Sequence, residues 1–184
     1  MHIDRITLDV PDPEHTARFF GDVLSAHSKD TGNTIEVALG RSRLALQQGK
    51  QDPDGYYHLA FDIPGNAIIE ARDLLRQRVD ILPAGADGIV TASPEWDASS
   101  VYFNAPGNLN LELIARHRLP NTIDRPFAMT DILNISEVGI PVLDDNFRMA
   151  GGWGHVEGPY ARGGAESVAF LGADGPPETP IPNG

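Results

Sequence analysis

The chain has 184 residues, of which 26 are acidic and 14 are basic, and its net charge is −12. This charge argues against a nucleic-acid backbone or an anionic membrane surface as a partner. The absence of cysteine excludes disulfides, thiolate nucleophiles and sulfur-ligated metal centres. No apolar run approaches ~20 residues, and no basic segment followed by an apolar one opens the chain, so we expect a cytoplasmic protein without a membrane span or secretory signal.

Two segments of the chain repeat one pattern. Residues 5–11 read RITLDVP and residues 58–64 read HLAFDIP, with apolar and polar positions in step. Each segment alternates in the way that predicts a strand with one buried face. Arg5 and His58 therefore take equivalent positions on equivalent faces of two similar units.

A helix is predicted after each of these strands. Asp12 is a suitable N-cap for the first helix, with Pro13 at its first position, and Asn66 is the predicted N-cap of the second. Apolar residues at helical spacing predict the buried stripes, which are Ala17, Phe20, Val23 and Leu24 in the first helix and Ile68, Ala71, Leu74 and Leu75 in the second.

Further strands follow each helix, separated by turns rich in glycine and proline. The alternation predicts strands at residues 33–40 and 41–48 in the first unit, and at 79–83, 100–104 and 109–115 in the second. Each unit thus reads as a strand, a helix and two or three more strands. The predicted class is α+β.

A third and weaker copy of the pattern occupies residues 132–172. EVGIPVL, at 137–143, repeats the alternation and carries Glu137 at the position of Arg5 and His58. A short helix is predicted within 143–156 and a strand at 167–172, but the last strands of a full unit are missing. We therefore divide the chain into a two-unit domain at 1–116, a linker at 117–131, this partial third unit, and a flexible tail at 173–184 that is too rich in proline and glycine to pack.

Three segments in this order, IDRITLDVPDPEHTARFFGDVL, HLAFDIP and VYFNAPGNLNLELIAR, resemble the vicinal oxygen chelate superfamily. That superfamily includes glyoxalase I, extradiol dioxygenases, fosfomycin-resistance enzymes and bleomycin-binding proteins. The resemblance implies paired βαβββ modules whose curled sheets form a cleft, here with a truncated extra module. It also implies a divalent metal held by side chains at the positions of Arg5, His58 and Glu112.

Arg5 departs from the family pattern, which has His or Gln at that position. A guanidinium has no lone pair to donate, so Arg5 cannot coordinate a cation. We interpret the metal site as degenerate, with Arg5 binding an anionic group of a ligand, pairing with Glu112, or lying in solvent. The glycine of the turn before Glu112 stands one residue early, which leaves the register of that strand open. Glu137 offers another route to a metal site, within the chain or from a neighbouring chain.

Two functions remain open at this point. The first is a small-molecule-binding protein that resembles the bleomycin-binding relatives and has a degenerate metal site, and the second is a metal-dependent lyase or dioxygenase of glyoxalase type, acting on a substrate with vicinal oxygens. A domain without any ligand is a third possibility. The cofactor is accordingly none or one Fe, Mn, Ni or Zn ion, bound by His58 and Glu112. Expected ligand-binding residues are Arg5, His58, Glu112, Tyr56 and Tyr102. The incomplete third unit leaves unpaired strand edges, which predicts a homodimer.

Overall fold

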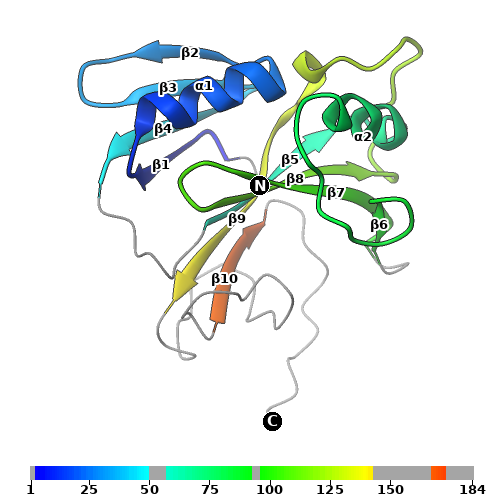
Figure 1. The fold of residues 1–184 in the computed structure, drawn as a ribbon. Helices are drawn as coiled ribbons and strands as arrows, with labels where there is room; N and C mark the ends of the chain where they lie inside the picture. Colours follow the sequence, from blue (N-terminus) through cyan, green and yellow to red (C-terminus); the bar gives the residue numbers. More distant parts are fainter. Residues whose placement is uncertain (1–2, 50–56, 93–95, 143–166, 173–184) are drawn as a thin grey trace.

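The computed structural model describes residues 3–49, 57–92, 96–142 and 167–172 (Figure 1). Its first part contains β1 (Arg5–Val10), α1 (Pro13–Leu24), β2 (His27–Asp30), β3 (Ile35–Leu39) and β4 (Ser42–Gln48). The second contains β5 (Tyr57–Ile63), α2 (Ile68–Arg76), β6 (Val90–Thr91), β7 (Ala98–Ala105) and β8 (Leu109–Arg116). The 3-10 helix η1 (Met129–Asp131), β9 (Asn134–Val142) and β10 (Ser167–Gly172) follow.

The strands form two mixed sheets. One has four strands in the order β1-β4-β3-β2, and the other has six in the order β10-β9-β5-β8-β7-β6. Helix α1 packs on the first sheet and α2 on the second, as Figure 1 shows. The predicted α+β fold of paired βαβββ modules with a truncated extra module is confirmed.

Module one, which comprises β1 to β4, forms largely as its sequence predicts. The Asp12 carboxylate accepts a hydrogen bond from the backbone N–H of His15 at 2.8 Å and so caps α1. The predicted stripe of this helix is buried together with Leu8 and Val10 of β1. Strand β2 was not predicted, because all four of its residues are exposed and it shows no apolar alternation.

Module two, which comprises β5 to β8, departs from its predicted elements in two places. The strand expected at 79–83 is reduced to one bridge between Ile81 and Phe103, and the short β6 pairs with β7 instead. Asn66 does not cap α2, which begins after Ala67 without a side-chain cap. The Asn66 amide instead exchanges two hydrogen bonds, of 2.7 and 3.1 Å, with the backbone of Ile123. A contact distant in sequence has taken the place of the local cap.

The remaining segments attach to module two. Strand β9 pairs antiparallel with β5, and β10 pairs with β9. Ile3 forms a bridge with Ile135, so the start of β9 also meets the segment before β1. Within the segment predicted as a linker, Phe127 and Met129 are buried in the core. The helix predicted within 143–156 and the tail lie outside the described residues.

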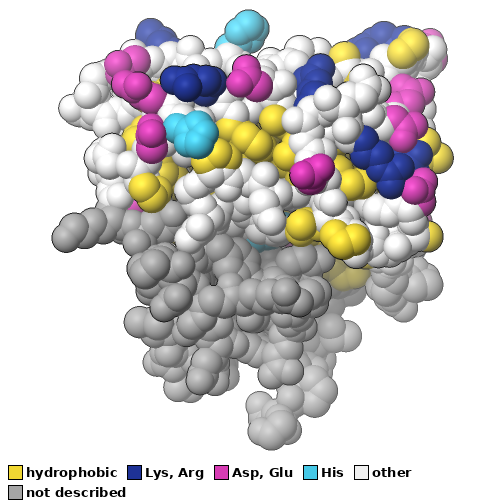
Figure 2. All heavy atoms as spheres, in the orientation of Figure 1, with side chains coloured by type: hydrophobic (Ala, Val, Ile, Leu, Met, Phe, Trp, Pro, Cys, Tyr) yellow, Lys and Arg dark blue, Asp and Glu magenta, His cyan; other side chains and the backbone are white. Residues whose placement is uncertain are grey.

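The exposed charges of the face in Figure 2 are mixed in sign, with Lys and Arg side chains close to Asp and Glu side chains. The net charge of −12 is therefore not gathered into one acidic patch on this face. Among the described residues, no helix has both the length and the apolar character needed to cross a membrane.

Candidate metal centre

His58 and Glu112 face each other on the side of the six-stranded sheet opposite α2. Leu59 and Leu111 alternate with them along β5 and β8 and belong to the hydrophobic core. His58 Nε2 lies 3.1 Å from Glu112 Oε2, and the two side chains are only 3% and 6% exposed. The early glycine in the preceding turn does not displace Glu112, which stands opposite Ala60 of β5 in the ladder.

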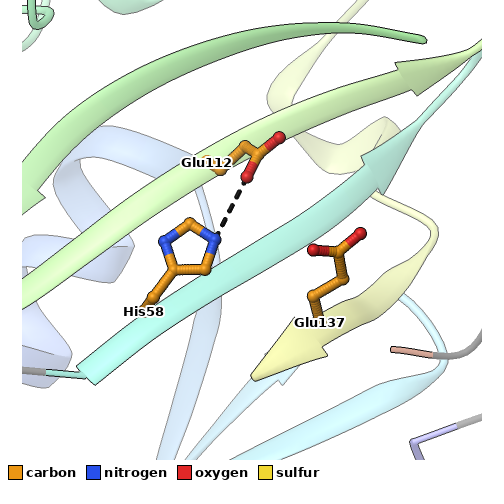
Figure 3. A group of neighbouring side chains, drawn as sticks. All are labelled: His58, Glu112 and Glu137. Carbon is orange, nitrogen blue, oxygen red and sulfur yellow. Dashed lines mark ion pairs between the residues drawn. The ribbon is translucent and has the colours of Figure 1, made fainter. Parts of the chain in front are cut away.

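Glu137 completes a group of three with these residues. It lies opposite Ala60 on the other edge of β5, and so β9 projects its carboxylate toward the same side of the sheet. One ligand atom from each of His58, Glu112 and Glu137 lies within 4.8 Å of the others. Figure 3 shows the three side chains pointing toward one another from three adjacent strands.

Arg116 pairs with one member of this group. Its guanidinium pairs with Glu137 Oε1 at 2.5 Å and with Asp62 Oδ1 at 3.1 Å, and it donates to Ser136 Oγ at 2.9 Å. The ring of Trp96 lies 5.4 Å from its central carbon. These contacts hold one oxygen of Glu137 and fix the position of the whole carboxylate.

The other ring nitrogen of His58 has its own partner. Nδ1 lies 3.0 Å from Oδ1 of Asn110, the residue opposite His58 on β8. The Asn110 amide nitrogen in turn donates to Oδ1 of Asn104 on β7, at 3.1 Å. The imidazole is therefore held on both sides, by an amide at Nδ1 and by a carboxylate at Nε2.

Burial and charge shift the pKa values of this group. Burial lowers the pKa of His58, but the hydrogen bond to Glu112 and the charge of that carboxylate outweigh it, and the net pKa is raised. Burial and the charge of Glu112 raise the pKa of Glu137, against the opposing effect of Arg116. The negative charge of Glu112 contributes to both shifts, and the site contains more negative than positive groups. A bound cation would balance this excess of negative charge.

The donor set fits a divalent metal ion. One imidazole nitrogen and two carboxylate oxygens suit Fe, Mn, Ni or Zn. Ligand atoms at about 2.1 Å from an ion stand at most about 4.2 Å apart. The three ligand atoms lie within 4.8 Å of one another, so small side-chain movements are enough to bring them to an ion. Among the described residues, Asp62, Glu112 and Glu137 are buried with one buried arginine, Arg116, so two positive charges would neutralise the cluster when His58 is neutral.

The structure distributes the other predicted site residues differently. Arg5 lies on β1 in the four-stranded sheet, where its side chain is 53% exposed and pairs with Glu36 at 3.0 Å. The suggested pair of Arg5 with Glu112 is thus replaced by a surface pair within module one. The ring of Tyr102 lies 6.3 Å from the ring of His58, beside the site. Tyr56 lies outside the described residues.

Sequence reasoning did not find Arg116, Asn110 or Asp62. The carboxylate of Asp62 binds Arg116 and accepts a hydrogen bond from Asn134 at 2.9 Å. A signal was present in the alternation, because Asn110 and Arg116 share the face of Glu112 on β8. Only the neighbouring strands show that this face is buried.

Solved structures of known fold superpose on this architecture. A glyoxalase/bleomycin resistance protein/dioxygenase from Nocardioides gives a TM-score of 0.51 at 19% identity, covering 68% of this chain and 89% of its own. A virulence protein from Salmonella typhimurium gives 0.50 at 20% identity, with 62% and 95% covered. An integron cassette protein from the Halifax Harbour sewage outfall metagenome gives 0.50 at 21%, with 61% and 97% covered.

The fold is that of the vicinal oxygen chelate superfamily. At these identities the likeness concerns the fold, and it confirms the resemblance drawn from the sequence at that level. No protein-family profile matches the sequence, and no curated protein matches it. Within the vicinal oxygen chelate fold, this chain places a strand-borne glutamate from a third segment beside His58 and Glu112.

Proposed function

We propose that this protein binds a divalent metal ion through His58, Glu112 and Glu137 and uses the ion to hold a small molecule by two neighbouring oxygen atoms. The proposal rests on one observation: three buried side chains, each able to offer a ligand atom to a metal ion, converge from three adjacent strands. Arg5 cannot supply a ligand, and Glu137 supplies the third one instead. The sequence-based alternative of a metal-dependent protein is therefore preferred to a degenerate site.

The chain's own residues have defined roles in this proposal. Glu137 and Glu112 contribute one oxygen each, and His58 contributes Nε2. Arg116 holds the second oxygen of Glu137 and keeps that carboxylate turned toward the site. When bound, a divalent ion acts as a Lewis acid that polarises the oxygen atoms of a coordinated substrate. Lyase or dioxygenase chemistry of the glyoxalase type is compatible with this arrangement.

A metal-free binding site is the second candidate, and one observation favours it. Arg116 already pairs with Glu137, and His58 already contacts Glu112, so each acidic group of the triad has a partner within the protein. In this case the site would be degenerate and the side chains would bind an organic ligand directly. Tyr102 is close enough to His58 to contribute to such a site.

Metal analysis separates the two candidates. Protein purified without chelator is analysed for metal by mass spectrometry and then titrated calorimetrically with manganous, ferrous, nickel and zinc ions. We expect one ion per chain, and a loss of affinity of at least about 100-fold in His58→Ala and Glu137→Gln. Glu36→Gln, which removes an acid from the exposed face of module one, is the matched control and should change the affinity less than twofold.

A wild-type protein that binds none of these ions would refute the metal proposal and leave the metal-free site. Binding that survives in Glu137→Gln but is lost in Glu112→Gln would show that β9 supplies no ligand. Once metal is bound, assays for glyoxalase-type isomerisation and for dioxygen uptake test the two enzyme classes.

The expected homodimer remains part of the proposal. Strand β2 ends the four-stranded sheet, and its four residues are exposed. An open edge of this kind is available for pairing with another chain. Sedimentation velocity over a range of concentrations tests this point, and a monomer throughout would refute it.

A further inference from the structure

We infer that Asn110, supported by Asn104, is a positioning residue that presents Nε2 of His58 to the metal ion. This inference rests on the proposed function, because it concerns the orientation of a metal ligand. Its structural part concerns the chain alone, namely which nitrogen of His58 carries the proton when the ring is neutral. That part can be tested without any metal.

The argument begins with the direction of two hydrogen bonds. Asn104 presents its amide oxygen to Asn110, and an amide oxygen can only accept. The amide nitrogen of Asn110 therefore points at Asn104, and its oxygen points at His58. Because that oxygen also only accepts, Nδ1 of His58 must be the donor and carry a hydrogen.

The consequence concerns the other nitrogen of the ring. A neutral imidazole carries one hydrogen, so a proton held at Nδ1 leaves the lone pair on Nε2. Nε2 is the atom that faces Glu112, at 3.1 Å. While the ring is charged, Nε2 also carries a hydrogen and donates it to Glu112. A cation that binds at Nε2 takes the place of this hydrogen and lies between the ring and the carboxylate. The hydrogen bonds from Asn104 through Asn110 to His58, here called the relay, thus orient Nε2 toward a cation shared with the carboxylates.

The relay also fixes the plane of the ring. His58 is 3% exposed and has polar contacts at both nitrogens, so rotation of the ring would break both. An asparagine supplies this acceptor without adding a further negative charge to a site that already contains two glutamates. Partners of this kind, which bind the second nitrogen of a metal-ligating histidine, contribute about 10- to 100-fold to metal affinity.

In the residues that the structure describes, module one has no counterpart of the hydrogen bonds that link Asn104, Asn110 and His58. Its ladder pairs Arg5 with Arg43, just as the ladder of module two pairs His58 with Asn110. Arg43 donates to the backbone oxygens of Gly40 and Ser42 and has no acceptor to offer an imidazole. The relay therefore accompanies the histidine and is not a general feature of the repeated fold.

The test uses the full chain and three variants. Asn110→Ala removes the acceptor, Asn110→Asp restores one in the same place, and Ser100→Ala is the control, a buried polar residue on the same side of β7. The first readout is the tautomer of His58 in metal-free protein, from long-range ¹⁵N–¹H correlation spectra recorded at a pH high enough for the ring to be neutral. The second is the affinity for manganous and zinc ions by calorimetry.

We expect the Nδ1–H tautomer in the wild type, in Ser100→Ala and in Asn110→Asp, and a mixture of tautomers in Asn110→Ala. Metal affinity should fall about 10- to 100-fold in Asn110→Ala and return to within a few-fold of the wild type in Asn110→Asp. Circular dichroism of each metal-free variant confirms that it is folded. Rescue by Asp excludes a loss of packing as the cause.

An Nε2–H tautomer in the wild type would overturn the inference, as would unchanged tautomer and affinity in Asn110→Ala. A wild-type protein that shows the Nδ1–H tautomer but binds no metal would refute the proposed function and leave the orientation of His58 established. The failures of the two proposals are therefore distinguishable. If Asn110→Ala does not fold, the tautomer in the wild type and in Asn110→Asp still decides.

Discussion

Modules one and two share one pattern, but only the second contains the candidate site. In the ladder of module one Arg5 lies opposite Arg43, and Thr7 lies opposite Ala45. In module two the same positions hold His58 opposite Asn110 and Ala60 opposite Glu112. Two arginines and an alanine thus stand where module two has histidine, asparagine and glutamate. The same backbone carries a cationic face in one module and a cation-binding face in the other.

The two modules also differ in what lies beside their first strands. Strand β5 has β9 along its edge, whereas the segment before β1 has one bridge, from Ile3 to the start of β9. His58 is buried, and Arg5 is 53% exposed. A buried site needs a third strand as well as the right residues, because burial raises the strength of each electrostatic contact.

The largest expected effect on the unfolding free energy comes from removing the buried arginine of module two. Arg116→Met leaves Asp62 and Glu137 without their cation, and loss of one partner of a buried ion pair costs about 3–5 kcal/mol of unfolding free energy. The matched change in module one, Arg43→Met, concerns an exposed side chain and should cost less than about 1 kcal/mol. Urea unfolding at pH 7 with chelator measures both. Equal costs would show that the charges of module two are solvated.

The second prediction compares the two helix starts. Asp12→Ala removes the side-chain cap of α1 and should cost about 1 kcal/mol. Asn66→Ala leaves the start of α2 intact, since that residue binds the backbone of Ile123 instead. Hydrogen exchange should therefore accelerate in the first turn of α1 in one variant and at the amide of Ile123 in the other. Acceleration within α2 in Asn66→Ala would contradict the assignment.

A smaller effect concerns the pH dependence of stability at the turn before β9. The described part of module one has no counterpart of this turn. Hydrogen bonds from Arg125 lower the pKa of Asp131 below its ordinary value. A carboxyl whose pKa is lower in the folded chain stabilises it above the unfolded pKa, and this stabilisation disappears as the pH falls through the folded value. Stability should therefore decline below about pH 4, by less in Asp131→Asn. Identical acid-unfolding curves for the two proteins would refute the coupling.

The smallest effect is expected at Arg5. Arg5→His places an imidazole on the exposed face of module one, on a different sheet from His58 and Glu112. Metal affinity should stay within twofold of the wild type, and the unfolding free energy should change by less than about 1 kcal/mol. Calorimetric titration with zinc and nickel ions checks the first value. A gain of tenfold or more would mean that Arg5 approaches the site in solution.

Much of this architecture follows from the sequence, because local spacing determines it. Period-two alternation predicts β1, β5 and β8, and helical spacing with Asp12 and Pro13 predicts α1. The repeat places His58 and Glu137 at equivalent positions, and the resemblance to the vicinal oxygen chelate superfamily adds Glu112. All three are named by pattern before any distance is known.

Only the tertiary structure decides which of these residues meet. Alternation reveals the face of a strand but not the strand beside it, so the sequence does not decide whether the position of Arg5 or that of Glu137 lies beside His58. The pairing of β9 with β5 brings Glu137 to His58, while β1 pairs with β4 and leaves Arg5 beside Glu36. Burial by neighbouring strands then makes Arg116 necessary, because carboxylates removed from water require a cation.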